Sequence, residues 1–333
     1  MHGFTKYTFT IFLSVILTVP SCAQPVSWFI KGYVQARYTD EIGQTLPENP
    51  ADDLQATPGT FELKRAYLYT HAQIDKHVGA ALLVRGVPDI RLREAYGEYT
   101  NGKFATRLGL AGFVFGYEVP LSSSNLITLD GAKVTDELFP FTFDRGIYAD
   151  YAVGNATLSL GVTNGTPPDV ATDPDSRKNI VGRLGYATGG VQAGASIYNG
   201  TPYIADPVDA ERDIHRQMDR YGVDVETYFG PWATISEVIL GKDDATGTGS
   251  ITSCGGYMTL AYRKANTAPQ PYLRFDTFDP NTHTSGDYFQ RWTAGMNYYL
   301  NPKAKVTLEY QYLRNGLEPN LHGQVATQYQ VIF

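Results

Sequence analysis

The feature that most restricts the fold of this chain is a two-residue alternation of apolar and polar side chains. It recurs in about sixteen segments of roughly ten residues each. In ATLSLGVT (156–163) every second residue is apolar, and VTLEYQYL (306–313) and WTAGMNYYL (292–300) follow the same rule. Side chains of an extended strand point alternately to opposite faces. The chain is therefore predicted to be all-β, with one apolar face on every strand.

The connections between these segments alternate in length. Short turn sequences, such as NG at Asn101 and GN at Gly154, are followed by longer polar connections. The long ones are expected at about residues 41–58, 117–143, 165–177, 200–217, 242–252, 279–287 and 315–322, with a short exception at 87–90. Every second connection of an up-and-down meander lies at the same end of the sheet, so this order predicts that topology.

The first 23 residues have the pattern of a secretory signal peptide. Lys6 precedes the apolar run FTIFLSVILTVP (9–20), which is too short to span a bilayer, and Ser21 and Ala23 occupy the small-residue cleavage positions. Cys22 leaves lipid attachment as an alternative. We expect the mature chain to begin near Gln24 and residues 24–333 to form one domain, with a single cysteine left and hence no disulfide framework.

An exported sheet of this size must protect its two edges. Closing it into a barrel removes them, and in lipid closure is obligatory because each unpaired backbone group costs several kcal/mol. Strand segments of about ten alternating residues match an apolar band about 25 Å tall. We therefore predict a transmembrane up-and-down antiparallel β-barrel of about 16 strands, surrounded by the outer-membrane lipids of a Gram-negative-type bacterium. The alternative is a secreted soluble binding protein, which would not need detergent for extraction.

The chain ends in QYQVIF (328–333), an alternating segment that stops on an aromatic residue. We interpret it as the last strand, with Tyr329, Val331 and Phe333 on the lipid side and Gln328 and Gln330 on the other. A terminal Phe resembles the signal that outer-membrane barrels present to their assembly machinery, so that machinery is an expected partner through Phe333. The alternative is a chance apolar end that closes a soluble sheet.

Four segments resemble the phosphate-selective porin O/P family, in the order that family shows. They are FELKRAYL (61–68), LREAYGEY (92–99), TRLGLAGFVFGYE (106–118) and FDRGI (143–147). The resemblance implies a sixteen-stranded porin, usually a homotrimer, whose third extracellular loop folds into the pore. The family typically has a Lys and a Pro before the Phe-Gly pair, whereas this chain has AGFV (111–114) there. Phosphate selectivity is therefore not carried over with the fold.

Charged residues fall mostly on the polar parity, which would face a water-filled lumen. A charge that faces lipid at mid-depth costs about 2–4 kcal/mol, so this sorting is expected. Inward arginines on the first five strands would be neighbours around the wall, and we call them the basic arc. Its members are Arg37, Arg65, Arg85, Arg93 and Arg107. The alternative is that these arginines only solvate the lumen and pair with nearby carboxylates.

The longest connection, about 117–143, is the candidate for a constriction loop folded into the lumen. It carries Asp130, Lys133, Asp136 and Glu137. An acidic loop opposite a basic wall would create a transverse field that orients solutes and selects them by charge and size. Alternatively, these acids are simply exposed, or bind divalent ions together with lipopolysaccharide.

No motif in the sequence points to a reaction. The histidines lack metal-ligand spacing, no G-x-S-x-G segment is present, and GKDDATGTGS (241–250) lacks the ends of phosphate and calcium loops. We predict no catalytic residue, metal or cofactor, and no nucleic-acid partner for a chain of net charge −7.

The predicted function is a non-enzymatic porin for passive diffusion of small hydrophilic solutes or ions, with anions as one option. Two alternatives stay open. One is a substrate-specific channel of the phosphate or polyphosphate type. The other is an outer-membrane lipolytic enzyme on a barrel, which would need a Ser and a His together on a lipid-facing strand.

Overall fold

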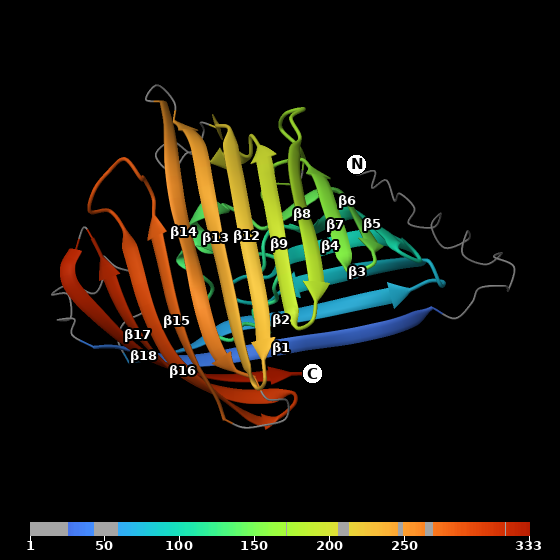
Figure 1. Cartoon of the computed structure of the whole chain (residues 1–333). Coiled ribbons are helices and arrows are strands. Elements are labelled where there is room, and N and C mark those ends of the chain that lie inside the picture. The colour runs from blue at the N-terminus through green and yellow to red at the C-terminus, as the bar shows by residue number, and fades with distance from the viewer. Residues whose placement is uncertain are drawn as a thin grey trace, which may run out of the picture.

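The computed structural model describes residues 26–42, 59–170, 172–205, 213–245, 249–263, 269–316 and 318–333. Within them, sixteen antiparallel strands form one closed barrel (Figure 1). The strands are β1 (Ser27–Ile42), β2 (Thr60–Gln73), β3 (Val78–Arg85), β4 (Arg91–Asn101), β5 (Phe104–Gly112), β6 (Phe143–Val153), β7 (Ala156–Thr163), β8 (Asn179–Thr188), β9 (Val191–Gly200), β12 (Met218–Phe229), β13 (Trp232–Ala245), β14 (Gly249–Tyr262), β15 (Gln270–Asp279), β16 (Phe289–Asn301), β17 (Ala304–Asn315) and β18 (Glu318–Ile332). The predicted fold class is confirmed. The signal-peptide and lipidation predictions lie outside the described residues.

Neighbouring strands in the sequence are neighbours in the barrel, as in an up-and-down meander. β9 pairs directly with β12, because the two short strands between them, β10 (Tyr203–Ala205) and β11 (Asp213–His215), form a separate hairpin. The barrel closes where β1 pairs with β18, in a register that runs from Tyr33 opposite Ile332 to Ile42 opposite Gly323. In the described part of the chain, no helix is long and apolar enough to cross a membrane.

The predicted alternation decides which side chains face outward. On β7, Leu158, Leu160 and Val162 are exposed on the outer wall. On β17, Thr307 and Glu309 are buried inside the barrel. An apolar outer belt around a polar interior is the arrangement of a barrel in lipid, because hydrocarbon accepts the aliphatic face and the lumen accepts the polar one.

The predicted alternation of connection lengths is wrong in two places. β13 ends at Ala245 and β14 begins at Gly249, and β17 ends at Asn315 with β18 beginning at Glu318. The segments 242–252 and 315–322 are therefore largely strand. Polar and glycine-rich sequence is typical of loops, but a hairpin that projects beyond the lipid belt can also carry it, because water surrounds its side chains there.

The last residue completes the barrel seam. The Phe333 N–H donates to the Gly32 carbonyl, and the Gly32 N–H donates to the Phe333 carbonyl, at 2.9 and 3.0 Å. The Phe333 ring lies over Gly32, where an added Cβ would come within 2.5 Å of it. Phe333 is 54% exposed, on the same outer side as Tyr329. A glycine at position 32 thus leaves room for the terminal aromatic ring.

Candidate functional site

The connection between β5 and β6 crosses the interior of the barrel. β5 ends at Gly112, so the connection begins at residue 113 and reaches 142; we call it the inner loop. Phe113, Phe115 and Phe139 are buried in one apolar cluster with Tyr148 of β6 and Tyr198 of β9. The segment that reads as the end of a strand therefore turns inward, because its phenylalanines pack against the lumen wall.

A short helix, α1 (Lys133–Leu138), forms the later part of the inner loop. Its residues Val134 and Leu138 are buried in the same apolar cluster, and the helix contacts β13, β14 and β15. Glycine on β14 makes this close approach possible, since a Cβ at Gly255 would come 2.8 Å from the Val134 side chain. This part of the inner loop is thus held against β13–β15 by ordinary core packing.

Two buried carboxylates fix the first part of the inner loop. Glu118 of the loop receives a bidentate pair of hydrogen bonds from Arg274 of β15, at 2.8 and 3.2 Å. Glu237 of β13 accepts the backbone N–H groups of Tyr117 and Glu118, at 3.1 and 3.2 Å. Both partners of the Glu118–Arg274 ion pair are almost fully buried. Removing one partner of such a pair is strongly destabilising because it leaves a buried charge unpaired.

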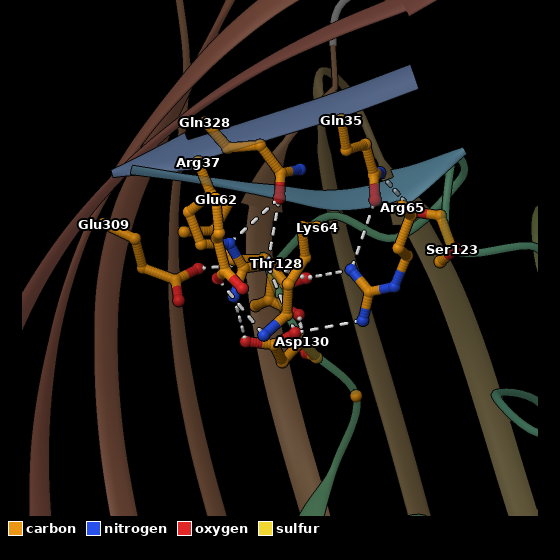
Figure 2. Close-up of polar contacts among 12 residues, drawn as sticks. Gln35, Arg37, Glu62, Lys64, Arg65, Ser123, Thr128, Asp130, Glu309 and Gln328 are labelled. Carbon is orange, nitrogen blue, oxygen red and sulfur yellow. Dashed lines mark hydrogen bonds and ion pairs between the residues drawn. The ribbon is translucent and has the colours of Figure 1, made fainter. Parts of the chain in front are cut away.

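The tip of the inner loop is tied to β1 and β2 (Figure 2). The Asp130 carboxylate accepts from Arg37 at 2.6 and 3.2 Å and from Arg65 at 3.0 Å. Arg37 also donates to Gln328 of β18 and to the Leu129 carbonyl. Burial alone would raise the pKa of Asp130, but the two guanidinium groups hold it well below its usual value. Asp130 is therefore ionised throughout the physiological pH range.

The remaining wall contributes further contacts to the loop backbone. On β17, Lys305 donates to the Leu126 carbonyl at 3.1 Å and Glu309 accepts the Leu129 N–H at 3.0 Å. On β16, Asn297 and Arg291 donate to the carbonyls of Ile127 and Gly131, at 2.8 and 2.6 Å. With Arg65 of β2, Ser196 of β9, which accepts the Gly116 N–H, and Arg220 of β12, which donates to the Leu138 carbonyl, the inner loop is attached to β1, β2, β9 and β12–β18. The β3–β5 wall bounds what is left of the lumen.

The five arginines of the predicted basic arc do not share one set of partners. Arg37 and Arg65 contact the inner loop through Asp130. Arg85 is ion-paired with Asp89, at the β3–β4 connection, and Arg107 lies 3.4 Å from Asp150 on β6. Four of the five arginines thus have a carboxylate partner, in the inner loop or in the neighbouring wall.

Arg93 differs from the other four arginines. It is the extra residue of a β-bulge, because Leu83 pairs with Glu94 and Val84 pairs with Leu92. Its guanidinium lies 5.7 Å from the centre of the Phe143 ring. Among the described residues no carboxylate forms an ion pair with it. The bulge interrupts the alternation, which is why the parity of this strand is ambiguous in the sequence.

The four charged residues predicted for the loop separate into two places. Asp130 is at the tip, whereas Lys133, Asp136 and Glu137 lie on α1, where Lys133 and Glu137 form an ion pair of 2.6 Å. Asp136 and Glu137 are exposed, on the side of α1 away from its buried residues. The lumen wall around Asp136 partly desolvates its carboxyl group, and the nearby Glu118 carboxylate repels its charged form. Together they raise the pKa of Asp136 to about 6.

Sequence reasoning did not single out the groups that hold the inner loop. Glu118 stands in the segment 106–118 that carries the family resemblance, and Glu237 lies on β13, far from that segment in the chain. Arg274 lies on β15, outside the predicted basic arc. The available signal is that all three are charged residues that must lie inside the barrel, facing its longest connection.

Solved structures confirm the architecture. The chain is similar to OmpT, an outer membrane protein of Vibrio cholerae in a trimer form, with 10% identity, a TM-score of 0.69, and coverage of 93% of this chain and 100% of that one. An anion-selective porin from Comamonas acidovorans has 11% identity, a TM-score of 0.69, and coverage of 93% and 100%. OmpF of Salmonella typhi in complex with daunomycin has 11% identity, a TM-score of 0.60, and coverage of 92% and 97%. At these identities the likeness concerns the fold, which is that of a porin barrel.

A family model narrows the class further. The model for phosphate-selective porin O and P matches residues 208–329. This match confirms the resemblance seen in the sequence, and it covers a segment C-terminal to the four motifs. No curated protein sequence matches the chain. The closed barrel, its apolar outer belt and the family match together define an outer-membrane channel of the porin type.

Proposed function

We propose that the protein is a passive diffusion channel whose width is set by the inner loop. The observation that carries this proposal is the attachment of residues 113–142 to β1, β2, β9 and β12–β18 through buried ion pairs, hydrogen bonds and apolar packing. A segment fixed inside the lumen in this way narrows it, and the β3–β5 wall becomes the other boundary of the passage. Small hydrophilic solutes would pass between the two.

The strand order supports a transverse field across this passage. α1 packs on β13–β15, and in the closed order seven strands separate β14 from β4 on either side. The exposed acids of α1, Asp136 and Glu137, thus lie across the barrel from the wall that carries Arg85, Arg93 and Arg107. Because carboxylates pair with most of these arginines, we expect charge to orient solutes more than it excludes one sign of ion.

Electrical recording in a planar bilayer tests the proposal. Purified protein should give a stable, linear current–voltage relation, and a salt gradient should give a small reversal potential. Absence of ion conductance from correctly folded protein would reject the channel. A saturable block by inorganic phosphate at micromolar concentration would instead favour the substrate-specific alternative, which the arginines of β1–β5 and the family match support.

We infer that the channel assembles as a homotrimer through the outer wall of β2–β4. A hollow of about 360 Å³ is lined there by small residues, including Ala80, Ala95 and Gly97, between the larger Trp28 and Leu108. Small residues favour protein–protein contact in lipid because backbones can approach closely.

We also infer that the barrel assembly machinery recognises Phe333. The position of Phe333 on the outer side of the seam supports this inference.

The lipolytic alternative finds no support in the described side chains. His71 contacts Glu98, and His77 contacts the Thr100 carbonyl. Neither is paired with a serine, and His71 faces the lumen instead of the lipid. A hydrolase assay with a long-chain ester, run beside the conductance measurement, would reverse this conclusion if it showed turnover.

A further inference from the structure

The β2–β5 wall carries aromatic rings where it faces the open lumen. Tyr67, Tyr69 and His71 occupy successive inward positions of β2, and each is half-buried. The planes of Tyr69 and His71 are 10° apart, with ring centres separated by 6.4 Å. Tyr67 in turn stacks on Tyr33 of β1, with centres 5.1 Å apart. We call Tyr67, Tyr69 and His71 the aromatic column.

The column is held in place by contacts that pass over β3. Of the inward positions of β3, Arg85 lies beside Tyr67, Leu83 beside Tyr69 and Ala81 beside His71. At the His71 end, the small Ala81 and Gly79 leave room for side chains of β2 and β4 to meet. His71 Nε2 lies 2.6 Å from Glu98 Oε1, and a Cβ at Gly79 would come 2.7 Å from that same oxygen.

Hydrogen-bonding groups surround the column. The exposed ammonium of Lys31 lies 4.7 Å from the centre of the Tyr69 ring. Arg65 lies at the Tyr67 end of the column, and its side chain is partly exposed. The Glu98 carboxylate lies at the His71 end. The wall therefore offers apolar ring surface together with charged donors and acceptors at short range.

This combination suits one class of solute. A cyclic sugar has an apolar C–H face, which packs on an aromatic ring, and an edge of hydroxyl groups, which bond to carboxylates, ammonium and guanidinium groups. An inorganic anion has no apolar face and would use only the cations. We propose that the aromatic column is a weak binding site for cyclic sugars within the channel, so that the passage favours them over acyclic polyols. The proposal rests on the proposed channel function.

Weak binding is what transport requires, because a solute must enter the site readily and also leave it. The position of the column supports this role. It runs along β2 from Arg65, where the inner loop is attached, and its rings are partly exposed instead of being packed beneath the loop as Tyr148 and Tyr198 are. A solute passing through the narrowed lumen would therefore meet these rings.

The experiment measures ion current through single channels while maltose is added, with sorbitol at equal concentration as the acyclic control. We expect maltose to reduce the current in a saturable way at millimolar concentration, and sorbitol to reduce it only through solution viscosity. Tyr69→Ala should raise the half-blocking concentration about tenfold, whereas Tyr69→Phe, which keeps the ring, should change it little. Tyr186→Ala, on the outer face of β8, is the matched control and should behave as wild type.

The outcomes are separable from those of the channel proposal. If wild-type channels conduct but maltose acts no differently from sorbitol, the sugar site is refuted while the channel stands. The same conclusion follows if maltose blocks equally in wild type and Tyr69→Ala. A block by inorganic phosphate at lower concentration than by maltose would also overturn the sugar-site proposal. Such a block would mean that the arginines, and not the rings, select the solute.

Discussion

The attachment of the inner loop through Asp130 leads to a quantitative prediction for Asp130→Ala. The substitution removes the carboxylate that receives Arg37 and Arg65, and it leaves Arg37, which is 5% exposed, with only Gln328 and a carbonyl as partners. Breaking a fully buried pair costs about 3–5 kcal/mol. Because the Asp130 side chain is 30% exposed, we discount this to about 2 kcal/mol.

A loss of about 2 kcal/mol lowers the ratio of attached to detached loop about thirtyfold. A detached loop widens the passage, so single-channel records should show a state of higher conductance whose occupancy rises by that factor. Asp173→Ala is the matched control. It removes an ion pair of 2.6 Å with the exposed Lys178 in the connection between β7 and β8, whose described residues make no contact with Asp130, and it should leave the record unchanged.

The result that would refute the reasoning is a folded Asp130→Ala channel with the same conductance and the same open-state noise as wild type. In that case Arg37 and Arg65 would not hold the loop. The deeper Glu118–Arg274 pair then becomes the decisive test, because both of its partners are buried. Glu118→Ala should produce a larger effect than Asp130→Ala at the same pH.

Three further predictions concern charge, assembly and export. Asp136, with a pKa of about 6, gains a proton as the pH falls from 7 to 5, so the reversal potential should shift toward anions over this range, and Asp136→Asn should abolish the shift. Gly97→Trp should fill the outer hollow and convert the trimer to monomers in native electrophoresis, while Val238→Trp, on the outer face of β13, should not. Phe333→Ala should reduce the amount of folded barrel in outer-membrane fractions severalfold without changing the conductance of the channels that do form.

The alternation in the sequence predicts the barrel well because each strand obeys one physical rule. Lipid and water lie on opposite sides of a single-layered wall, so parity alone places Leu158 outside and Glu309 inside. The rule fails where a strand continues beyond the lipid, as at 242–252, because polar side chains then face water on both sides. It also fails at Arg93, where a bulge adds one residue and shifts the parity.

The candidate site is less accessible to such reasoning. Sequence identifies the longest connection and its charged residues, but not the partners of these residues, since Arg37 and Arg274 lie far from the loop in the chain. Phe113 and Phe115 read as the end of a strand, yet they turn inward because tertiary packing in the lumen outweighs local pattern. The ion pairs of Arg85 and Arg107 likewise depend on which strands become neighbours.

The contacts of the inner loop on both sides of the seam have a consequence for how the barrel is made. Its tip is bound by Arg37 on the first strand and by Glu309 on the penultimate one, and these strands reach each other only through β18. Pairing the two ends of a long chain is entropically slow. A loop that binds strands near both ends of the chain can bring the two edges of the open sheet close together before β1 pairs with β18. Shortening it should therefore delay closure of the cylinder during refolding into detergent micelles, in addition to widening the finished pore.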